Sequence, residues 1–231
     1  MNIKSQLICA HTAPLWLFTC YLGLFYLSGW IPPFSPALPT TEIAAIFDDN
    51  ARLRVGMAIV AFVSPLFMGL AAPICVQLRR IEGKHHVFAN LQLCSAAVGV
   101  LALQFPGLFW LAASYRPGID PDVVATFSDV SWFLILGGVA PAIAQNLCIA
   151  GAILLAEKPH DVFPRWLGFF NLWIALTFVP GVMLPFFKTG PFAWNGLFGF
   201  WVVAIGFATW ILVQYVCTLQ AIRRQRESTV D

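Results

Sequence analysis

Apolar residues fill six long segments of this chain, separated by short stretches that carry its charges, prolines and glycines. The segments cover residues 13–30, 55–78, 89–115, 131–157, 167–187 and 197–219. A bilayer core about 30 Å thick takes roughly 20 helical residues per crossing. The segments are too long and too continuous for the alternating strands of a membrane barrel. The pattern therefore predicts an all-α membrane protein: one domain over residues 1–231, built as a bundle of six transmembrane helices and ending in a basic tail at 220–231.

Composition supports this class, because 59% of the residues are hydrophobic and only 10% are charged. Soluble domains carry far more charge. The formal net charge of +2 gives no basis for a nucleic acid partner. The first segment is interpreted as a retained helix and not a cleaved signal peptide, because no Ala-x-Ala pattern follows it.

The basic residues predict the orientation of the bundle. Six crossings place both termini on one side, and short cytoplasmic loops are enriched in Lys and Arg. Nine basic residues fall on the side of the termini: Lys4, Arg79, Arg80, Lys84, Lys158, Arg165, Arg223, Arg224 and Arg226. Four fall on the other side: Arg52, Arg54, Arg116 and Lys188. We therefore expect both termini in the cytoplasm.

Two acidic segments share a pattern eighty positions apart, at residues 41–49 and 121–129. Asp120 before Pro121 is a strong helix start. Each segment has apolar residues at helical spacing opposite its carboxylates, which predicts short outer amphipathic helices before the second and fourth spans. Alternatively, each segment extends the span that follows. Pro65 and Pro141 in those spans extend the similarity and favour a parallel repeat, although outer loops are commonly acidic and rich in proline.

Neutral polar residues are the candidates for function, since the interior of the predicted spans holds no ionisable residue. In the third span Asn90, Ala97 and Gln104 recur every seven residues and so share one helix face. Gln145 and Asn146 lie near the middle of the fourth span, and Asn171 lies in the fifth.

Such amides usually form hydrogen bonds between helices, and small faces such as Gly138/Ala142 and Ala204/Ala208 usually allow close helix approach. The alternative is that Gln104, Gln145, Asn146 and Asn171 bind a ligand in a largely apolar pocket. Aromatic residues could form the wall of that pocket, while Trp30 and Trp194 suit anchoring at the membrane interface.

No catalytic residue, cofactor or metal site is predicted. The histidines, His11, His85, His86 and His160, are expected at cytoplasmic helix ends, and their spacing matches no metal motif. The six cysteines form no Cys-x-x-Cys pair, and no disulfide is implied. Motifs of serine hydrolases and phosphate-binding loops are missing from the sequence.

Four stretches, at residues 28–33, 78–83, 163–173 and 185–196, resemble an uncharacterised family of bacterial multi-pass membrane proteins of similar length. The resemblance covers most of the chain. It implies a bacterial inner (cytoplasmic) membrane and contributes no site residue.

Three hypotheses follow, in this order of preference. The first is an integral membrane protein that binds or translocates a small, mostly apolar compound. The second is a non-catalytic partner subunit of a membrane complex, and the third is a membrane-embedded enzyme. The expected partners are membrane lipid together with such a ligand or another membrane protein.

Overall fold

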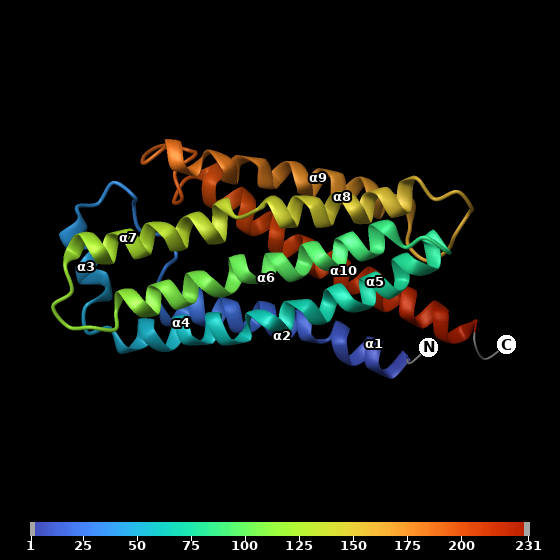
Figure 1. The fold of residues 1–231 in the computed structure, drawn as a ribbon, viewed down its shortest axis with the longest axis horizontal. Coiled ribbons are helices and arrows are strands. Elements are labelled where there is room, and N and C mark those ends of the chain that lie inside the picture. Colours follow the sequence, from blue (N-terminus) through green and yellow to red (C-terminus); the bar gives the residue numbers. More distant parts are fainter. Residues whose placement is uncertain (1–2, 229–231) are drawn as a thin grey trace.

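The chain folds into a bundle of six long helices (Figure 1). The computed structural model describes residues 3–228, and this part of the chain contains helices and loops without strands. Each long helix has the length and hydropathy needed to cross a membrane. Their bounds are Ile3–Leu27, Ala51–Glu82, Val87–Ala113, Pro121–Leu154, Arg165–Phe186 and Leu197–Glu227. The prediction of an all-α membrane protein with six crossing helices is confirmed.

Both termini lie at the same end of the bundle (Figure 1). We call it the termini end, and it also carries the connections at residues 83–86 and 155–164. The opposite end, called the α3 end, carries the short helix α3 (Thr40–Phe47) and the connections at 114–120 and 187–196. The assignment of the termini end to the cytoplasm stays a prediction.

The long helices are assembled from shorter pieces of different helical geometry. The first consists of α1 (Ile3–Ala10), α2 (Thr12–Cys20) and the π-helix η1 (Tyr21–Leu27). The second consists of α4 (Ala51–Val63), the 3₁₀ turn η2 (Ser64–Phe67) and α5 (Met68–Glu82), and the third is α6 (Val87–Ala113). The fourth consists of α7 (Pro121–Trp132), the π-helix η3 (Phe133–Gly137) and α8 (Ala140–Leu154). The fifth joins α9 (Arg165–Phe178) to the 3₁₀ segment η4 (Val179–Phe186), and the sixth joins the π-helix η5 (Leu197–Trp201) to α10 (Val202–Glu227).

Proline explains three of these changes in geometry. Pro65 lies in η2, Pro141 lies in the first turn of α8 just after the break that follows η3, and Pro180 lies at the start of η4. A proline lacks the N–H that an α-helix needs and clashes with the preceding turn. The second and fourth long helices are thus interrupted at the two prolines that the sequence comparison paired.

The helices extend beyond the apolar segments at several ends. The first begins at Ile3, ten residues before the predicted start. Its first turns combine polar with apolar residues, so they were not counted in the apolar segment. The expected basic tail continues α10 through Glu227, and its residues 229–231 lie outside the described part.

The two acidic segments fold differently. The first forms α3, a separate short helix that packs against α7 and buries Ile43 and Phe47. The second begins α7, where the Asp120 carboxylate accepts a hydrogen bond of 2.8 Å from the Asp122 amide. This helix runs directly into η3, so the second segment extends the span that follows it.

Glycines allow the first two long helices to cross closely. A Cβ placed on Gly56 would lie 2.5 Å from the carbonyl oxygen of Gly23, and a Cβ on Gly23 would lie 2.7 Å from that of Gly56. Only residues without side chains fit such a crossing, as is typical of membrane helices.

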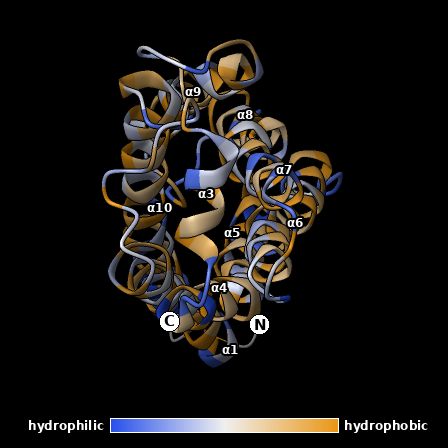
Figure 2. Ribbon diagram, turned by 90° about the vertical axis from the view of Figure 1, so that its left-hand side faces the viewer, coloured by the Kyte–Doolittle hydropathy of each residue, from blue (hydrophilic) through white to orange (hydrophobic). Residues whose placement is uncertain are grey.

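Hydrophobic residues cover much of the helical surface, and hydrophilic residues gather in the loops (Figure 2). Large apolar side chains such as Phe62, Trp173 and Phe186 are exposed along the bundle. A lipid environment suits this surface, since soluble monomers rarely expose large contiguous apolar areas.

Candidate functional site

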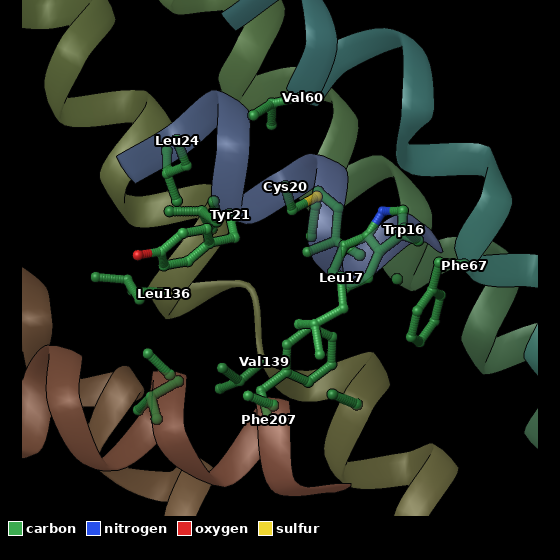
Figure 3. A pocket seen from close by; sticks show the side chains of 18 of the residues that line it. Trp16, Leu17, Cys20, Tyr21, Leu24, Val60, Phe67, Leu136, Val139 and Phe207 are labelled. Carbon is green, nitrogen blue, oxygen red and sulfur yellow. The ribbon is translucent and has the colours of Figure 1, made fainter. Parts of the chain in front are cut away.

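A cavity of about 590 Å³ lies inside the bundle (Figure 3). Its walls come mainly from α2, η1, α6, η3, α8 and α10. In Figure 3 the side chain of Leu17 points from the first long helix toward Val139 and Phe207, and Tyr21 points toward Leu136. The cavity therefore lies where the first, fourth and sixth long helices meet.

Small residues on three helices leave this space open. Gly99 and Ala102 of α6, Gly138 and Ala142 at the start of the α8 segment, and Ala204 and Ala208 of α10 all line the cavity. Gly138 also allows α6 to approach, since a Cβ there would lie 3.2 Å from that of Ala102. The helix faces of small residues that the sequence analysis identified therefore line the cavity as well as making contacts between helices.

The interruption of the fourth long helix shapes one wall. Leu136, Gly138 and Val139 line the cavity at the break between η3 and α8, where the chain leaves regular helical geometry. Irregular backbone at membrane depth is stable where protein or a cavity surrounds it.

Gln145 is the one amide side chain in an otherwise largely apolar wall. Its side chain is 2% exposed, and its Nε2 atom has no hydrogen-bond partner among the described residues. The indole nitrogen of Trp16, also in the wall, is buried and equally without a partner there. Buried polar groups nearly always have partners. Both N–H groups thus belong to residues of the cavity wall and lack a partner in the described part of the chain.

Asn171 is part of a hydrogen-bonded contact between the fifth and sixth long helices. Its Oδ1 accepts hydrogen bonds of 2.9 Å from Trp210 Nε1 and 2.8 Å from Gln214 Nε2. Its Nδ2 donates to the carbonyl oxygen of Leu167 at 2.7 Å. Asn171 does not line the cavity, and its hydrogen-bonding groups are already engaged.

The other two candidate residues also lie outside the cavity wall. Asn146 is buried, and its Nδ2 donates to the Ala142 carbonyl at 2.8 Å while its Oδ1 has no partner in the described chain. Gln104 is partly exposed. Of the four predicted ligand-binding residues, the structure brings only Gln145 to the cavity.

Sequence reasoning missed Gln92 and Trp16. Gln92 is fully buried in α6, and neither of its amide atoms has a partner within residues 3–228. The seven-residue spacing instead pointed to the face of Asn90 and Ala97, which is exposed. A helix that is apolar all round gives little indication of which face is buried.

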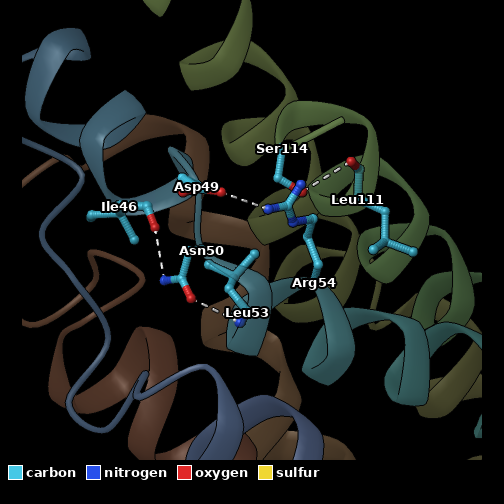
Figure 4. A network of polar contacts seen from close by, with 7 residues as sticks. All are labelled: Ile46, Asp49, Asn50, Leu53, Arg54, Leu111 and Ser114. Carbon is cyan, nitrogen blue, oxygen red and sulfur yellow. Dashed lines mark hydrogen bonds and ion pairs between the residues drawn. The ribbon is translucent and has the colours of Figure 1, made fainter. Parts of the chain in front are cut away.

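A second hollow, of about 510 Å³, lies at the α3 end between α3 and the connection from α6 to α7. Figure 4 shows part of its rim, where Arg54 forms an ion pair of 3.2 Å with Asp49. Asn50 begins α4 by accepting a 3.0 Å hydrogen bond from the Leu53 amide. The Asp49 side chain is fully exposed, so this ion pair contributes little stability.

At the termini end, three buried glutamines join three helices. Gln77 of α5 donates to Gln6 of α1 at 2.7 Å and to Gln225 of α10 at 2.8 Å. Arg80 donates to Gln77 Oε1 at 2.6 Å. This cluster fixes both ends of the chain to the second long helix.

Ionisable side chains do not gather around the cavity. Among the described residues no three His, Cys, Asp or Glu side chains come together in a way that could hold a metal ion. The site is thus a largely apolar chamber whose wall includes Gln145 and Trp16. The chain matches no family model, no curated protein and no solved structure in the comparisons with known proteins.

Proposed function

We propose that this integral membrane protein binds a small, mostly apolar compound in the cavity, with Gln145 as its main polar contact. The observation that carries the proposal is a buried, unpartnered amide N–H in the wall of a large apolar chamber. Ligand pockets commonly combine apolar walls with a few polar groups that fix orientation.

The cavity volume sets the size of the ligand. A water-sized group occupies about 30 Å³, so the chamber accommodates roughly twenty non-hydrogen atoms. A compound of this size with one oxygen that accepts from Gln145 Nε2 fits both the volume and the chemistry of the wall. Lipids, isoprenoids and similar bilayer-soluble molecules belong to this class.

Binding would give the buried Gln145 amide a hydrogen-bond partner. A buried donor without a partner costs about 1 to 3 kcal/mol, and a ligand oxygen at Gln145 recovers part of it. Apolar contact with Leu17, Val139 and Phe207 supplies the remaining affinity. The same proposal includes translocation, in which the bound ligand would move across the membrane. It also places the protein in a bacterial inner membrane.

Native mass spectrometry of the detergent-purified protein, followed by extraction of whatever stays bound, tests the proposal. The wild type is expected to retain one defined compound, and both Gln145→Leu and Ala204→Phe are expected to lose it. Gln145→Leu removes the donor, whereas Ala204→Phe fills the chamber.

Matched controls make these losses specific. Gln104→Leu applies the same change outside the cavity wall, and Ala97→Phe applies the same enlargement on the exposed face of α6. Both controls should retain the compound. Heterogeneous phospholipid alone in the wild type, or a co-purifying protein in its place, would refute the proposal and favour the partner-subunit hypothesis.

A further inference from the structure

The cavity reaches the surface of the bundle between the first and sixth long helices. Three residues that line it are also well exposed: Phe18 (62%), Tyr21 (57%) and Leu212 (49%). These residues lie on apolar helices that cross the membrane, so the opening faces lipid chains. A bilayer-soluble molecule can reach the cavity sideways through this mouth.

A histidine lies beside the mouth, inside the first long helix. This helix begins at Ile3, so His11 is its ninth residue and lies between α1 and α2. Gln6, five residues earlier, is hydrogen-bonded to Gln77, which also accepts from the charged Arg80. At 1.5 Å per residue, His11 is about 7 Å deeper in the bundle than Gln6. Because the first long helix starts earlier than the apolar segment, His11 lies at the junction of α1 and α2 and not at the first turn of that long helix.

An ionisable residue at this depth is expensive and usually functional. The Nδ1 atom of His11 is 2.6 Å from the carbonyl oxygen of Leu7, which makes Nδ1 the protonated donor nitrogen. The other ring nitrogen, Nε2, is then left to interact with a ligand. The side chain of His11 is exposed.

Tyr215 of α10 completes a polar pair with His11. The two rings meet edge to face, with centroids 5.8 Å apart and planes at 81°. The Tyr215 hydroxyl makes no hydrogen bond within the described part of the chain. His11 is three residues from Pro14 and Tyr215 is three from Leu212, and both of these residues line the cavity. Residues three apart share a helix face, so the pair lies next to the mouth, on its termini side.

We infer that His11 and Tyr215 bind the head of a single-chain lipid whose chain passes through the mouth into the cavity. The head carries a hydroxyl or a carboxylic acid, which donates to His11 Nε2 and accepts from the Tyr215 hydroxyl. A second oxygen along the chain then meets Gln145. This inference rests on the proposed function for the cavity itself and adds the ligand class, its route and its second anchor.

Photolabelling in phosphatidylcholine vesicles tests the inference. The probes are a long-chain fatty alcohol and a long-chain fatty acid, each carrying a diazirine on the chain, and the methyl ester of the same acid. After illumination, mass spectrometry of peptides measures labelling of the cavity wall on α8 and α10. The ester keeps the chain but cannot donate a hydrogen bond to His11.

Tyr215→Phe removes only the hydroxyl, and His11→Phe keeps an aromatic ring against Tyr215. Each variant should lower cavity labelling by the alcohol and the acid about fivefold, as expected for one lost hydrogen bond. Labelling by the ester should stay unchanged in His11→Phe and should fall in Tyr215→Phe, because the ester carbonyl oxygen still accepts from the Tyr215 hydroxyl. Tyr115→Phe and His85→Phe, at exposed positions away from the mouth, should behave as the wild type with every probe.

The outcomes separate this inference from the proposed function. If Ala204→Phe abolishes labelling but neither mouth variant changes it, the cavity binds lipid and the role of His11 and Tyr215 is refuted. If His11→Phe lowers labelling by all three probes equally, its effect is structural and the inference is again overturned. If no probe labels the wild-type cavity and no compound is retained on purification, the proposed function fails as well.

Discussion

Asn171→Leu should destabilise the bundle by removing the polar contact between its fifth and sixth long helices. The substitution removes the acceptor of two buried hydrogen bonds, those from Trp210 and Gln214. Both donors then stay buried without a partner, since both side chains are 0–1% exposed. Leucine resembles asparagine in length, so the change is mainly one of polarity.

The magnitude follows from measured hydrogen bonds between membrane helices, which average about 0.6 kcal/mol and reach about 1.7 kcal/mol. Two such bonds give a loss of about 1 to 3 kcal/mol in the free energy of unfolding. Because the two donors share one acceptor, Gln214→Leu should cost much less in the Asn171→Leu background than in the wild type.

Reversible unfolding in mixed micelles, by titration with a denaturing detergent, measures this loss. Gln104→Leu is the control, because Gln104 is partly exposed and lies outside both the cavity and this contact. A free energy for Asn171→Leu within about 0.5 kcal/mol of that control would refute the structural role of Asn171.

Three further predictions concern packing, capping and orientation. Gly56→Ala should lower the free energy of unfolding by about 1 to 3 kcal/mol, because its Cβ would lie 2.5 Å from a backbone oxygen. Gly99→Ala is the control in the same titration. It should be nearly neutral, because the nearest atom to a Cβ there is 3.8 Å away. Equal effects of the two would contradict the close crossing. Asn50→Ala should cost about 1 kcal/mol through the lost cap of α4, measured as a shift of the thermal unfolding midpoint, and an unchanged midpoint would show that the cap is unimportant. In a chain whose native cysteines are replaced, Lys188→Cys should react with an impermeant thiol reagent on intact cells and Ser228→Cys only after lysis; the reverse pattern would invert the predicted orientation.

The helices were predictable from the sequence because bilayer thickness and backbone hydrogen bonding leave few alternatives for long apolar segments. Their ends were less so. The first helix begins at Ile3 because Gln6 is satisfied by Gln77 and Gln225, a contact between residues far apart in the sequence. The hydropathy of a sequence does not predict hydrogen bonds between residues so far apart.

The rotation of each helix was harder to predict than its existence. In a membrane bundle the lipid-facing and buried faces are both apolar, so periodicity does not separate them. Gln92 is buried whereas Asn90 is exposed, although both lie on α6. Trp30 and Trp194 suited an interfacial position, but each is nearly fully buried, in an aromatic cluster with Trp132.

The cavity depends on features that a sequence does not place together. Gly99, Gly138 and Ala204 lie on three helices, and only the folded bundle shows that they surround one space. The sequence could propose Gln145 as a ligand contact, but it gave equal standing to Asn171, whose groups are taken up by Trp210 and Gln214. A choice between ligand contact and helix contact requires knowing which partners are within reach.

A crystal structure of the protein grown from a lipidic phase tests the central claim most directly. The account predicts continuous density for one elongated molecule in the cavity, with a ligand oxygen within hydrogen-bonding distance of Gln145 Nε2. A cavity closed by repacked side chains, with Gln145 hydrogen-bonded to the protein itself, would contradict it.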